Sequence, residues 1–263
     1  NLRFDVLTVA TWNVNSIKAR LDHVLQWCAE AAPDVLAVQE TKTVDAAFPR
    51  EALAPLGYVQ TFCGQPSYNG VAILSRRPPR EIVTALPAFD DEQRRVLGAA
   101  FDDFFLLNLY VPNGSAVGSD KYAYKLAWLD ALLAWLPDLL KAHERLLIVG
   151  DFNIAPDDRD VHDPAAWRDQ VLCSEPERAR LKALQDLGFR DLFREFEAEG
   201  GHFTWWDYRA GAFRRNHGLR IDLAWGSPAL APLCRGVSID RAPRKWDKPS
   251  DHAPVITRLD FPA

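Results

Sequence analysis

The chain has 263 residues, of which 48% are hydrophobic and 25% charged, values that are ordinary for a globular protein with a large core. Its longest apolar run falls well short of the roughly 20 residues that a membrane span requires, so no membrane association is expected. The formal net charge of −5 argues against attachment to nucleic acid by bulk positive charge, although it is compatible with a local basic face.

The four cysteines form no CxxC pair and have no metal-finger spacing with histidine. Isolated cysteines of this kind are typical of reduced thiols in a cytosolic protein. We therefore expect a cytoplasmic protein without disulfides.

Strand-like and helix-like segments alternate through the first half of the chain. Apolar residues at helical spacing predict a helix over residues 17–31, which Pro33 ends. A longer helix is predicted over residues 121–143, with Pro137 as a candidate kink. The apolar runs that predict strands lie at residues 7–12, 35–38, 71–74, 82–83, 96–101 and 104–111. The last two runs, separated by Asp102 and Asp103, predict a hairpin.

The second half continues this mixture. Ser174 and Glu177 have the spacing of a capping box, which predicts a helix up to Leu187 that Gly188 ends. Further strands are predicted at residues 203–208, 221–225, 237–239 and 254–259. Because hairpins mix with helical crossovers, we predict an α/β sandwich of two mixed sheets packed face to face with helices outside. A doubly wound parallel sheet is the alternative, and its glycine-rich phosphate loop is absent.

Two polar motifs stand at the edges of apolar runs. The first is GDFN at 150–153, directly after a predicted strand, and the second is SDHAP at 250–254, directly before one. Charged and amide groups at the ends of buried strands are costly to desolvate unless they have partners or a task. Asp151 is suited to deprotonate a water and Asn153 to donate to a phosphate oxygen. The alternative is a Gly-Asp turn with a local asparagine cap.

Adjacent residues of a strand face opposite ways, so Asp251 and His252 require different partners. Asp251 is suited to help hold a divalent cation. Asp222 is the best candidate to orient His252 and to stabilise its protonated form, the alternative being a structural histidine. Glu40 ends another predicted strand and is a natural ligand for a hard cation, or else a residue of a helix start.

Amide and phenol groups end two other predicted strands. Asn13 and Asn15 have the spacing seen at 151 and 153, but an asparagine-rich turn with Ser16 as a helix cap explains them equally well. Tyr110 and Asn113 either reach a phosphate or belong to an ordinary turn.

A late segment, FTWWDYR at 203–209, is aromatic and ends in Arg209, and more basic residues follow at 214–220 and 241–248. Aromatic side chains interleaved with arginine suit a surface that binds a nucleic-acid backbone. Core tryptophans beside a solvated loop are the alternative.

In order and spacing, these motifs resemble the bacterial exonuclease III-type AP endonucleases of the endonuclease/exonuclease/phosphatase superfamily. The segments that carry the resemblance are TWNVN (11–15), QETK (39–42), NGVA (69–72), YVPNG (110–114), GDFNI (150–154), FTWWDYR (203–209), GLRID (218–222) and SDHAP (250–254). The resemblance implies one such domain over residues 1–263, a four-layer α/β sandwich, with Mg²⁺ or Mn²⁺ as cofactor.

The resemblance also implies roles for individual residues. The cation site would be centred on Glu40, with Asn15 and Asp251 nearby, and Asp151 would position and deprotonate the attacking water. The residues implied to contact the scissile phosphate are Asn13, Tyr110, Asn113, Asn153 and His252, the last oriented by Asp222. The residues implied to face DNA are Trp205, Leu219 and Ile221, around a flipped-out abasic sugar, and Arg209 on the surface.

The function that follows is a metal-dependent DNA repair nuclease. We expect a monomer that incises double-stranded DNA 5′ to abasic sites and removes nucleotides or phosphate from blocked 3′ ends. A phosphatase of lipids or small phosphate esters, or a catalytically dead nucleic-acid-binding relative, would have the same fold. Ser16 stands where many relatives have glycine, and the loop at 157–173, which varies among relatives, is expected to influence the balance of activities.

Overall fold

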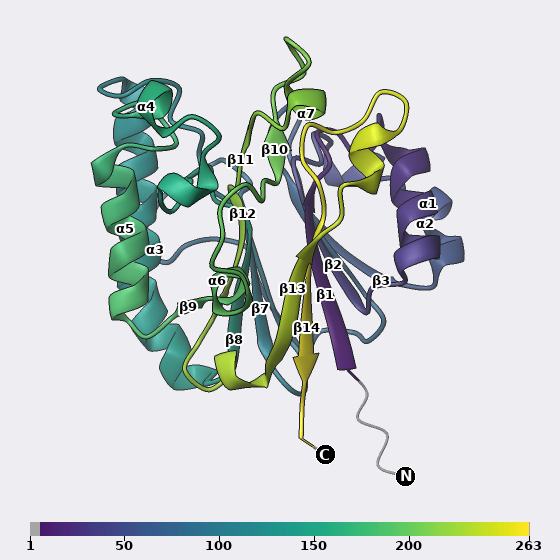
Figure 1. Cartoon of the computed structure of the whole chain (residues 1–263). Helices are drawn as coiled ribbons and strands as arrows, with labels where there is room; N and C mark the ends of the chain where they lie inside the picture. The colour runs from purple at the N-terminus through teal and green to yellow at the C-terminus, as the bar shows by residue number, and fades with distance from the viewer. Residues whose placement is uncertain (1–5, 263) are drawn as a thin grey trace.

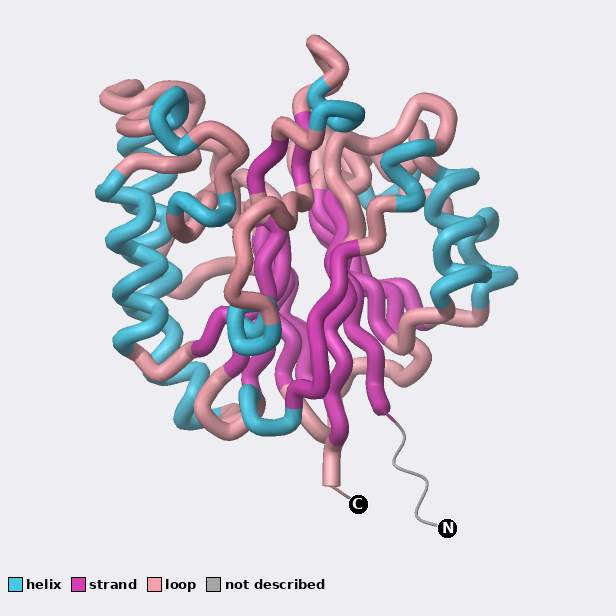
Figure 2. The backbone as a smooth tube through the Cα atoms, viewed as in Figure 1, coloured by secondary structure: helices cyan, strands magenta, loops and turns pink. Residues whose placement is uncertain are grey.

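The computed structural model describes residues 6–262, and its strands form two large sheets with helices on their outer faces (Figures 1 and 2). The first sheet has the order β13-β14-β1-β2-β4-β3 and the second the order β5-β6-β7-β8-β12-β9. The strands of the first are β1 (Val6–Asn13), β2 (Val35–Gln39), β3 (Val59–Cys63), β4 (Val71–Ser75), β13 (Cys234–Ile239) and β14 (Val255–Asp260). The strands of the second are β5 (Glu81–Val83), β6 (Val96–Ala100), β7 (Phe105–Tyr110), β8 (Leu146–Asp151), β9 (Arg190–Asp191) and β12 (Asp222–Gly226).

Shorter elements surround the sheets. β10 (Trp205–Trp206) pairs with β11 (Gly218–Leu219) apart from both. The helices are α1 (Leu21–Ala31), α2 (Arg50–Leu53), α3 (Asp120–Ala142), α4 (Pro164–Trp167), α5 (Glu175–Asp186), α6 (Leu192–Phe196) and α7 (Ala212–Arg215). Single turns of 3₁₀ helix are η1 (Asp45–Ala47), η2 (Ala54–Leu56), η3 (Asp158–Asp160), η4 (Ala231–Leu233) and η5 (Ala242–Lys245). Within residues 6–262, no helix has both the length and the apolar character needed to cross a membrane.

Apolar side chains fill three layers between these elements. The central cluster joins the inner faces of the two sheets, with Val9 and Ile73 from the first and Leu106 and Val149 from the second. A second cluster packs α3 and α5 against the outer face of the second sheet, and a third packs α1 against the first. Sheets buried on both faces require near-continuous apolar strands, which explains runs such as LLIV before GDFN. The predicted sandwich is confirmed, and the doubly wound alternative is wrong.

Several predicted elements agree with the structure. β6 and β7 form the hairpin expected around residues 102 and 103. α3 runs without interruption through Pro137. The capping box of Ser174 and Glu177 opens α5. Sequence analysis missed β3 and several elements of two to five residues, namely β9, β11, α2, α4, α6 and α7.

The helix predicted from residue 17 begins only at Leu21. Asn15 and Ser16 have positive φ angles of 47° and 83°, so the chain leaves β1 in a turn rather than entering a helix. The Ser16 hydroxyl accepts a hydrogen bond from the backbone N–H of Ala19 at 3.2 Å. The hydroxyl thus caps the turn at residues 17–20, in which the Arg20 N–H also bonds the Ser16 carbonyl at 3.1 Å.

The strand predicted at residues 203–208 is wrong in extent, because only Trp205 and Trp206 pair. Thr204, just before them, accepts backbone N–H bonds from Ile221 and Asp222 at 3.0 Å each. Side-chain bonds of this kind compete with a strand ladder. They also fix the backbone at the start of β12.

A buried ion-pair network holds the chain that leads into β12. The Arg220 guanidinium donates to Asp160 at 2.7 Å and to Asp191 at 2.5 Å, and Arg194 donates to Asp160 at 2.5 Å. Arginine keeps its charge when buried, and its planar fork suits two carboxylates. The network therefore joins η3, β9 and the segment before β12.

Replacing Arg220 by methionine should destabilise the fold by about 3–5 kcal/mol, because two buried carboxylates lose their counter-charge. The free energy of unfolding in urea measures this loss. Arg235→Met is the control, since Arg235 is exposed and lies 3.4 Å from Asp260; it should cost less than about 1 kcal/mol. Similar losses in the two variants would contradict the prediction.

Candidate active site

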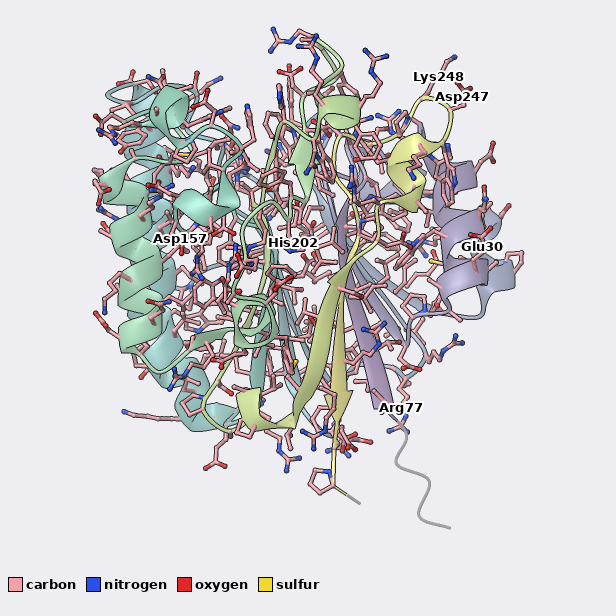
Figure 3. The ribbon with its side chains drawn as sticks, viewed as in Figure 1. Glu30, Arg77, Asp157, His202, Asp247 and Lys248 are labelled. Carbon is pink, nitrogen blue, oxygen red and sulfur yellow. The ribbon has the colours of Figure 1, made fainter. Side chains whose placement is uncertain are left out.

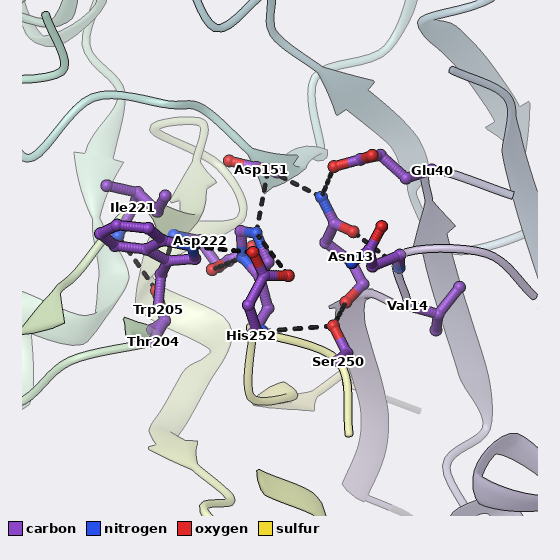
Figure 4. A network of polar contacts seen from close by, with 12 residues as sticks. Asn13, Val14, Glu40, Asp151, Thr204, Trp205, Ile221, Asp222, Ser250 and His252 are labelled. Carbon is purple, nitrogen blue, oxygen red and sulfur yellow. Dashed lines mark hydrogen bonds and ion pairs between the residues drawn. The ribbon is translucent and has the colours of Figure 1, made fainter. Parts of the chain in front are cut away.

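Strand ends from both sheets meet at one end of the molecule. β1 and β2 run parallel, as do β7 and β8, so the carboxyl ends within each pair lie at the same edge. β12 runs antiparallel to β8, which places Asp222 opposite Asp151. β14 runs antiparallel to β1, which brings the segment before β14 beside the end of β1. The topology thus gathers Asn13, Glu40, Asp151, Asp222 and His252 (Figure 4).

The amide of Asn13 joins two carboxylates at the seam between the sheets. Its Nδ2 donates to Glu40 Oε1 at 2.8 Å and to Asp151 Oδ2 at 2.8 Å. Its Oδ1 accepts from the backbone N–H of Asn15 at 3.0 Å, and its backbone carbonyl accepts from the Ser250 hydroxyl at 2.6 Å. These bonds fix the orientation of the amide, so both of its N–H groups donate to carboxylates.

His252 lies between carboxylates. Its Nδ1 is 2.7 Å from Asp222 Oδ2, while its Nε2 is 3.5 Å from Asp151 Oδ2 and 3.9 Å from Asp251 Oδ1. Burial by itself lowers the pKa of His252, but the charges of Asp222, Asp151 and Asp251 outweigh it and raise that pKa well above its ordinary value. The three carboxylates therefore favour the protonated form of the ring, whose Nε2 faces Asp151.

Two other acidic groups have raised pKa values. Burial raises the pKa of Asp151, the charge of His252 opposes this, and the charge of Asp222 adds to it. Asp151 is thus a carboxylate that accepts a proton more readily than an exposed one. Burial and the charges of Glu40 and Asp151 raise the pKa of Tyr110 well above 10, so this phenol keeps its proton and can donate it in a hydrogen bond.

Glu40, Asp151 and His252 can hold a divalent cation. Each offers one ligand atom, and these atoms all lie within 4.8 Å of one another. Two carboxylates suit a hard cation such as Mg²⁺ or Mn²⁺, and the Nδ1 contact with Asp222 orients the imidazole as a metal ligand requires. The carboxylates of Glu40 and Asp151 fit the implied cation, whereas His252 would join them only after giving up the Nε2 proton that faces Asp151.

The two other residues that the sequence assigned to the cation already have partners. Asn15 Oδ1 accepts from Lys42 Nζ at 2.7 Å, and Asp251 Oδ2 accepts from Trp205 Nε1 at 3.0 Å. A cation at these groups would use their remaining lone pairs. Their assignment stays a prediction.

The amides of Asn113 and Asn153 meet beside Asp151. Asn153 is not extended, since its φ is 49°, and its backbone N–H donates to Asp151 Oδ1 at 3.0 Å. Its Nδ2 donates to the carbonyl of Val111 at 2.8 Å, and Asn113 Nδ2 donates to Asn153 Oδ1 at 3.4 Å. Two loops thereby present amide groups at the same point of the site.

The predicted DNA-facing residues occupy different environments. Leu219 and Ile221 are fully buried in a cluster against which Trp205 packs, so they form the wall behind that indole. Arg209 is exposed and pairs with Asp207 at 2.7 Å. Lys248 and Asp247 project together from the loop after η5 in Figure 3, on the side of the strand ends that form the site.

Sequence analysis missed Lys125, whose ammonium contacts the backbone of both asparagine loops. A signal was available, because this lysine occupies a core-facing position of α3 together with Tyr122, Trp128 and Leu129. Polar residues at such positions are rare without a partner. Lys42, which binds Asn15, gave no comparable signal.

Comparisons with known proteins identify the family of the chain. A model of the "Endonuclease/Exonuclease/phosphatase family" matches residues 10–252. The chain is 34% identical to Exodeoxyribonuclease III of Haemophilus influenzae over 261 residues, covering 93% of this chain and 97% of that protein. It is 31% identical to the DNA repair nuclease APEX1 of Danio rerio, covering 96% of this chain and 82% of that protein.

Solved structures are also similar. NExo, a 3′ phosphatase from Neisseria bound to a product DNA hairpin, has a TM-score of 0.95 and 42% identity, covering 97% of this chain and all of that chain. An AP endonuclease from Archaeoglobus fulgidus has a TM-score of 0.92 and 36% identity, with the same coverage. The predicted superfamily is confirmed, and the chain belongs to the endonuclease/exonuclease/phosphatase family.

Proposed function

We propose that the protein is a metal-dependent DNA repair nuclease that incises DNA 5′ to abasic sites and removes nucleotides or phosphate from blocked 3′ ends. The observation that supports this most is the position of Asp151, buried between the Asn13 amide and the protonated ring of His252. A proton acceptor, a cationic donor and a candidate cation ligand thus share one cluster. The names of the relatives favour DNA over lipid or small phosphate esters as substrate.

The proposed reaction is an in-line attack of water on phosphorus. A P–O bond forms to the water oxygen as the bond to O3′ breaks, and Asp151 takes the proton of the water. The donors to the phosphate oxygens are His252 Nε2–H, the phenol of Tyr110 and the amides of Asn113 and Asn153. Asn13 would join them only by exchanging its bond to Glu40 or Asp151 for one to the phosphate. Mg²⁺ or Mn²⁺, held at Glu40, supplies charge stabilisation when it is bound.

Recognition of damaged DNA is proposed to involve Trp205 and the wall formed by Leu219 and Ile221. An abasic nucleotide costs less to extrude from the helix than a paired base, which contributes to selectivity. Arg209 and Lys248 would contact the DNA backbone. A monomeric state and a cytoplasmic location remain predictions.

Asp222→Asn should lower the single-turnover nicking rate roughly 10- to 100-fold, because the residue that orients His252 loses its charge. The loss should grow as the pH rises, since an imidazole without this carboxylate releases its proton at a lower pH. Rates over a pH series measure both effects. Asp260→Asn, at the exposed pair with Arg235, is the control, and equal pH profiles in all three proteins would contradict the prediction.

A side-by-side assay tests the proposed function. Duplexes with an abasic analogue, a 3′-phosphate or a recessed 3′ end are incubated with Mg²⁺ or with a chelator. Chelator-sensitive turnover of at least one duplex is expected. No turnover of any duplex would refute the proposal, and faster phosphate release from a lipid phosphate would support the phosphatase alternative.

A further inference from the structure

Lys125 of α3 is a lysine whose side chain is completely buried. Its ammonium donates to the carbonyl of Asn113 at 3.1 Å, to the carbonyl of Asn153 at 2.6 Å and to the carboxylate of Glu177. Three N–H groups therefore have three acceptors. Burial lowers the pKa of Lys125, but the neighbouring charge of Glu177 opposes this.

Glu177 is itself held by the backbone at the start of α5. Its Oε1 accepts from the backbone N–H of Leu172 at 3.0 Å. Its Oε2 accepts from the backbone N–H of Ser174 at 3.1 Å and from the hydroxyl of Ser174 at 2.5 Å. The ion pair consequently joins α3, the end of the 157–173 loop, and the two loops that follow β7 and β8.

Fold stability alone does not require this charge. Replacing a buried ion pair by apolar residues of similar volume is often neutral or stabilising. An apolar side chain, however, cannot bind two carbonyl groups from different loops at one point. The ammonium of Lys125 does this for Asn113 and Asn153.

Both carbonyls belong to residues that lie beside Asp151. The side chains of Asn113 and Asn153 contact each other at 3.4 Å, and the backbone of Asn153 contacts Asp151 at 3.0 Å. The φ of 49° at Asn153 lies in the left-handed region, which non-glycine residues adopt when surrounding contacts hold them there. The Lys125 contact is one such restraint.

We propose that Lys125 is a positioning residue of the phosphodiester-cleaving site: its ammonium clamps the backbones of Asn113 and Asn153 and so sets their amide groups beside Asp151. Glu177 supplies the counter-charge that keeps the ammonium in the core. The inference rests on the proposed function, because it takes these two amides as donors to the scissile phosphate. The absence of a side chain at Gly114 leaves room for Lys125, since a Cβ there would lie 3.0 Å from Lys125 Cδ.

Two variants separate positioning from stability. Lys125→Met should lower kcat for nicking of an abasic duplex roughly 10- to 100-fold with a smaller change in KM, because the two amides are misplaced. It should also lower Tm, since Glu177 stays charged without a partner. The double variant Lys125→Met/Glu177→Gln removes both charges, so its Tm should rise toward the wild-type value while its kcat stays low. Recovery of kcat together with Tm would overturn the positioning role.

A double-mutant cycle with Asn153→Ala provides a readout that a purely structural lysine would not change. Asn153→Ala should lower kcat less in the Lys125→Met background than in the wild type, because the amide is already displaced. Additive losses would overturn the proposal. Lys182→Met, at an exposed pair with Asp186, is the control and should leave kcat and Tm unchanged. If the wild type turns over none of the abasic, 3′-phosphate and recessed 3′ duplexes, the proposed function is refuted instead.

Discussion

Asp151→Asn is expected to lower the single-turnover rate of abasic-site nicking by about 10⁴-fold, the upper range for loss of a general base. Asparagine has nearly the shape of aspartate but cannot accept the proton of the attacking water. The variant also loses the negative charge that faces His252 at 3.5 Å. The loss should therefore arise in the chemical step rather than in DNA binding.

The fold should survive this substitution. Asp151 accepts from the backbone of Asn153 and from the side chain of Asn13, and one of these donors would face the new NH₂ group. An unsatisfied buried group costs about 1–3 kcal/mol of folding free energy. A loss of stability of this size does not account for the expected change in rate. DNA affinity, measured with the abasic duplex under chelator, should not decrease, because one negative charge near the phosphate is removed.

The control for Asp151→Asn is Asp186→Asn, which removes an exposed carboxylate paired with Lys182. It should nick at the wild-type rate. Nicking by Asp151→Asn within tenfold of the wild-type rate would contradict its assignment as the base.

The parts of the site that follow from local rules were predictable from sequence. Asp251 and His252 were expected to have different partners, and the structure gives Asp251 a bond from Trp205 Nε1 and His252 a contact with Asp222. The reason offered, strand alternation, is wrong, because β14 begins only at Val255. Burial of β8 on both faces made the apolar run before Asp151 recognisable. The apolar run needs only neighbouring residues to be recognised.

The remaining features depend on contacts between distant segments. Lys125 and Glu177 are separated by 52 residues, and their pairing is decided by how α5 packs on α3. The left-handed backbone of Asn153 depends on hydrogen bonds with other segments, which the local sequence does not reveal. Thr204 shortens the predicted strand through bonds to a segment that lies 17 and 18 residues later.

Glu40→Gln is expected to lower the nicking rate roughly 10³-fold at a Mg²⁺ concentration that saturates the wild type, because cation stabilisation is worth several kcal/mol. Glu40 Oε1 accepts from Asn13, and Oε2 is 3.4 Å from Lys42 Nζ. Glutamine keeps the length of the side chain but removes the charge that would bind the cation. Raising the Mg²⁺ concentration should recover part of the rate. Glu30→Gln, on the exposed face of α1, is the control and should nick normally.

Thermal unfolding gives a measure of cation binding that does not depend on catalysis. A cation that binds only the folded protein raises Tm with increasing concentration. The Mg²⁺ midpoint of this rise should shift upward in Glu40→Gln, and an unchanged midpoint would contradict its role as a ligand.

The same titration distinguishes the two cation sites that sequence and geometry suggest. If Glu40 acts with Asn15 and Asp251, Asp251→Asn shifts the midpoint and Asp151→Asn does not. If the cation is instead held by the cluster of Glu40, Asp151 and His252, Asp151→Asn shifts it as well. In that second case, part of the rate lost in Asp151→Asn reflects weaker cation binding, and the part that saturating Mg²⁺ does not recover measures the contribution of the base.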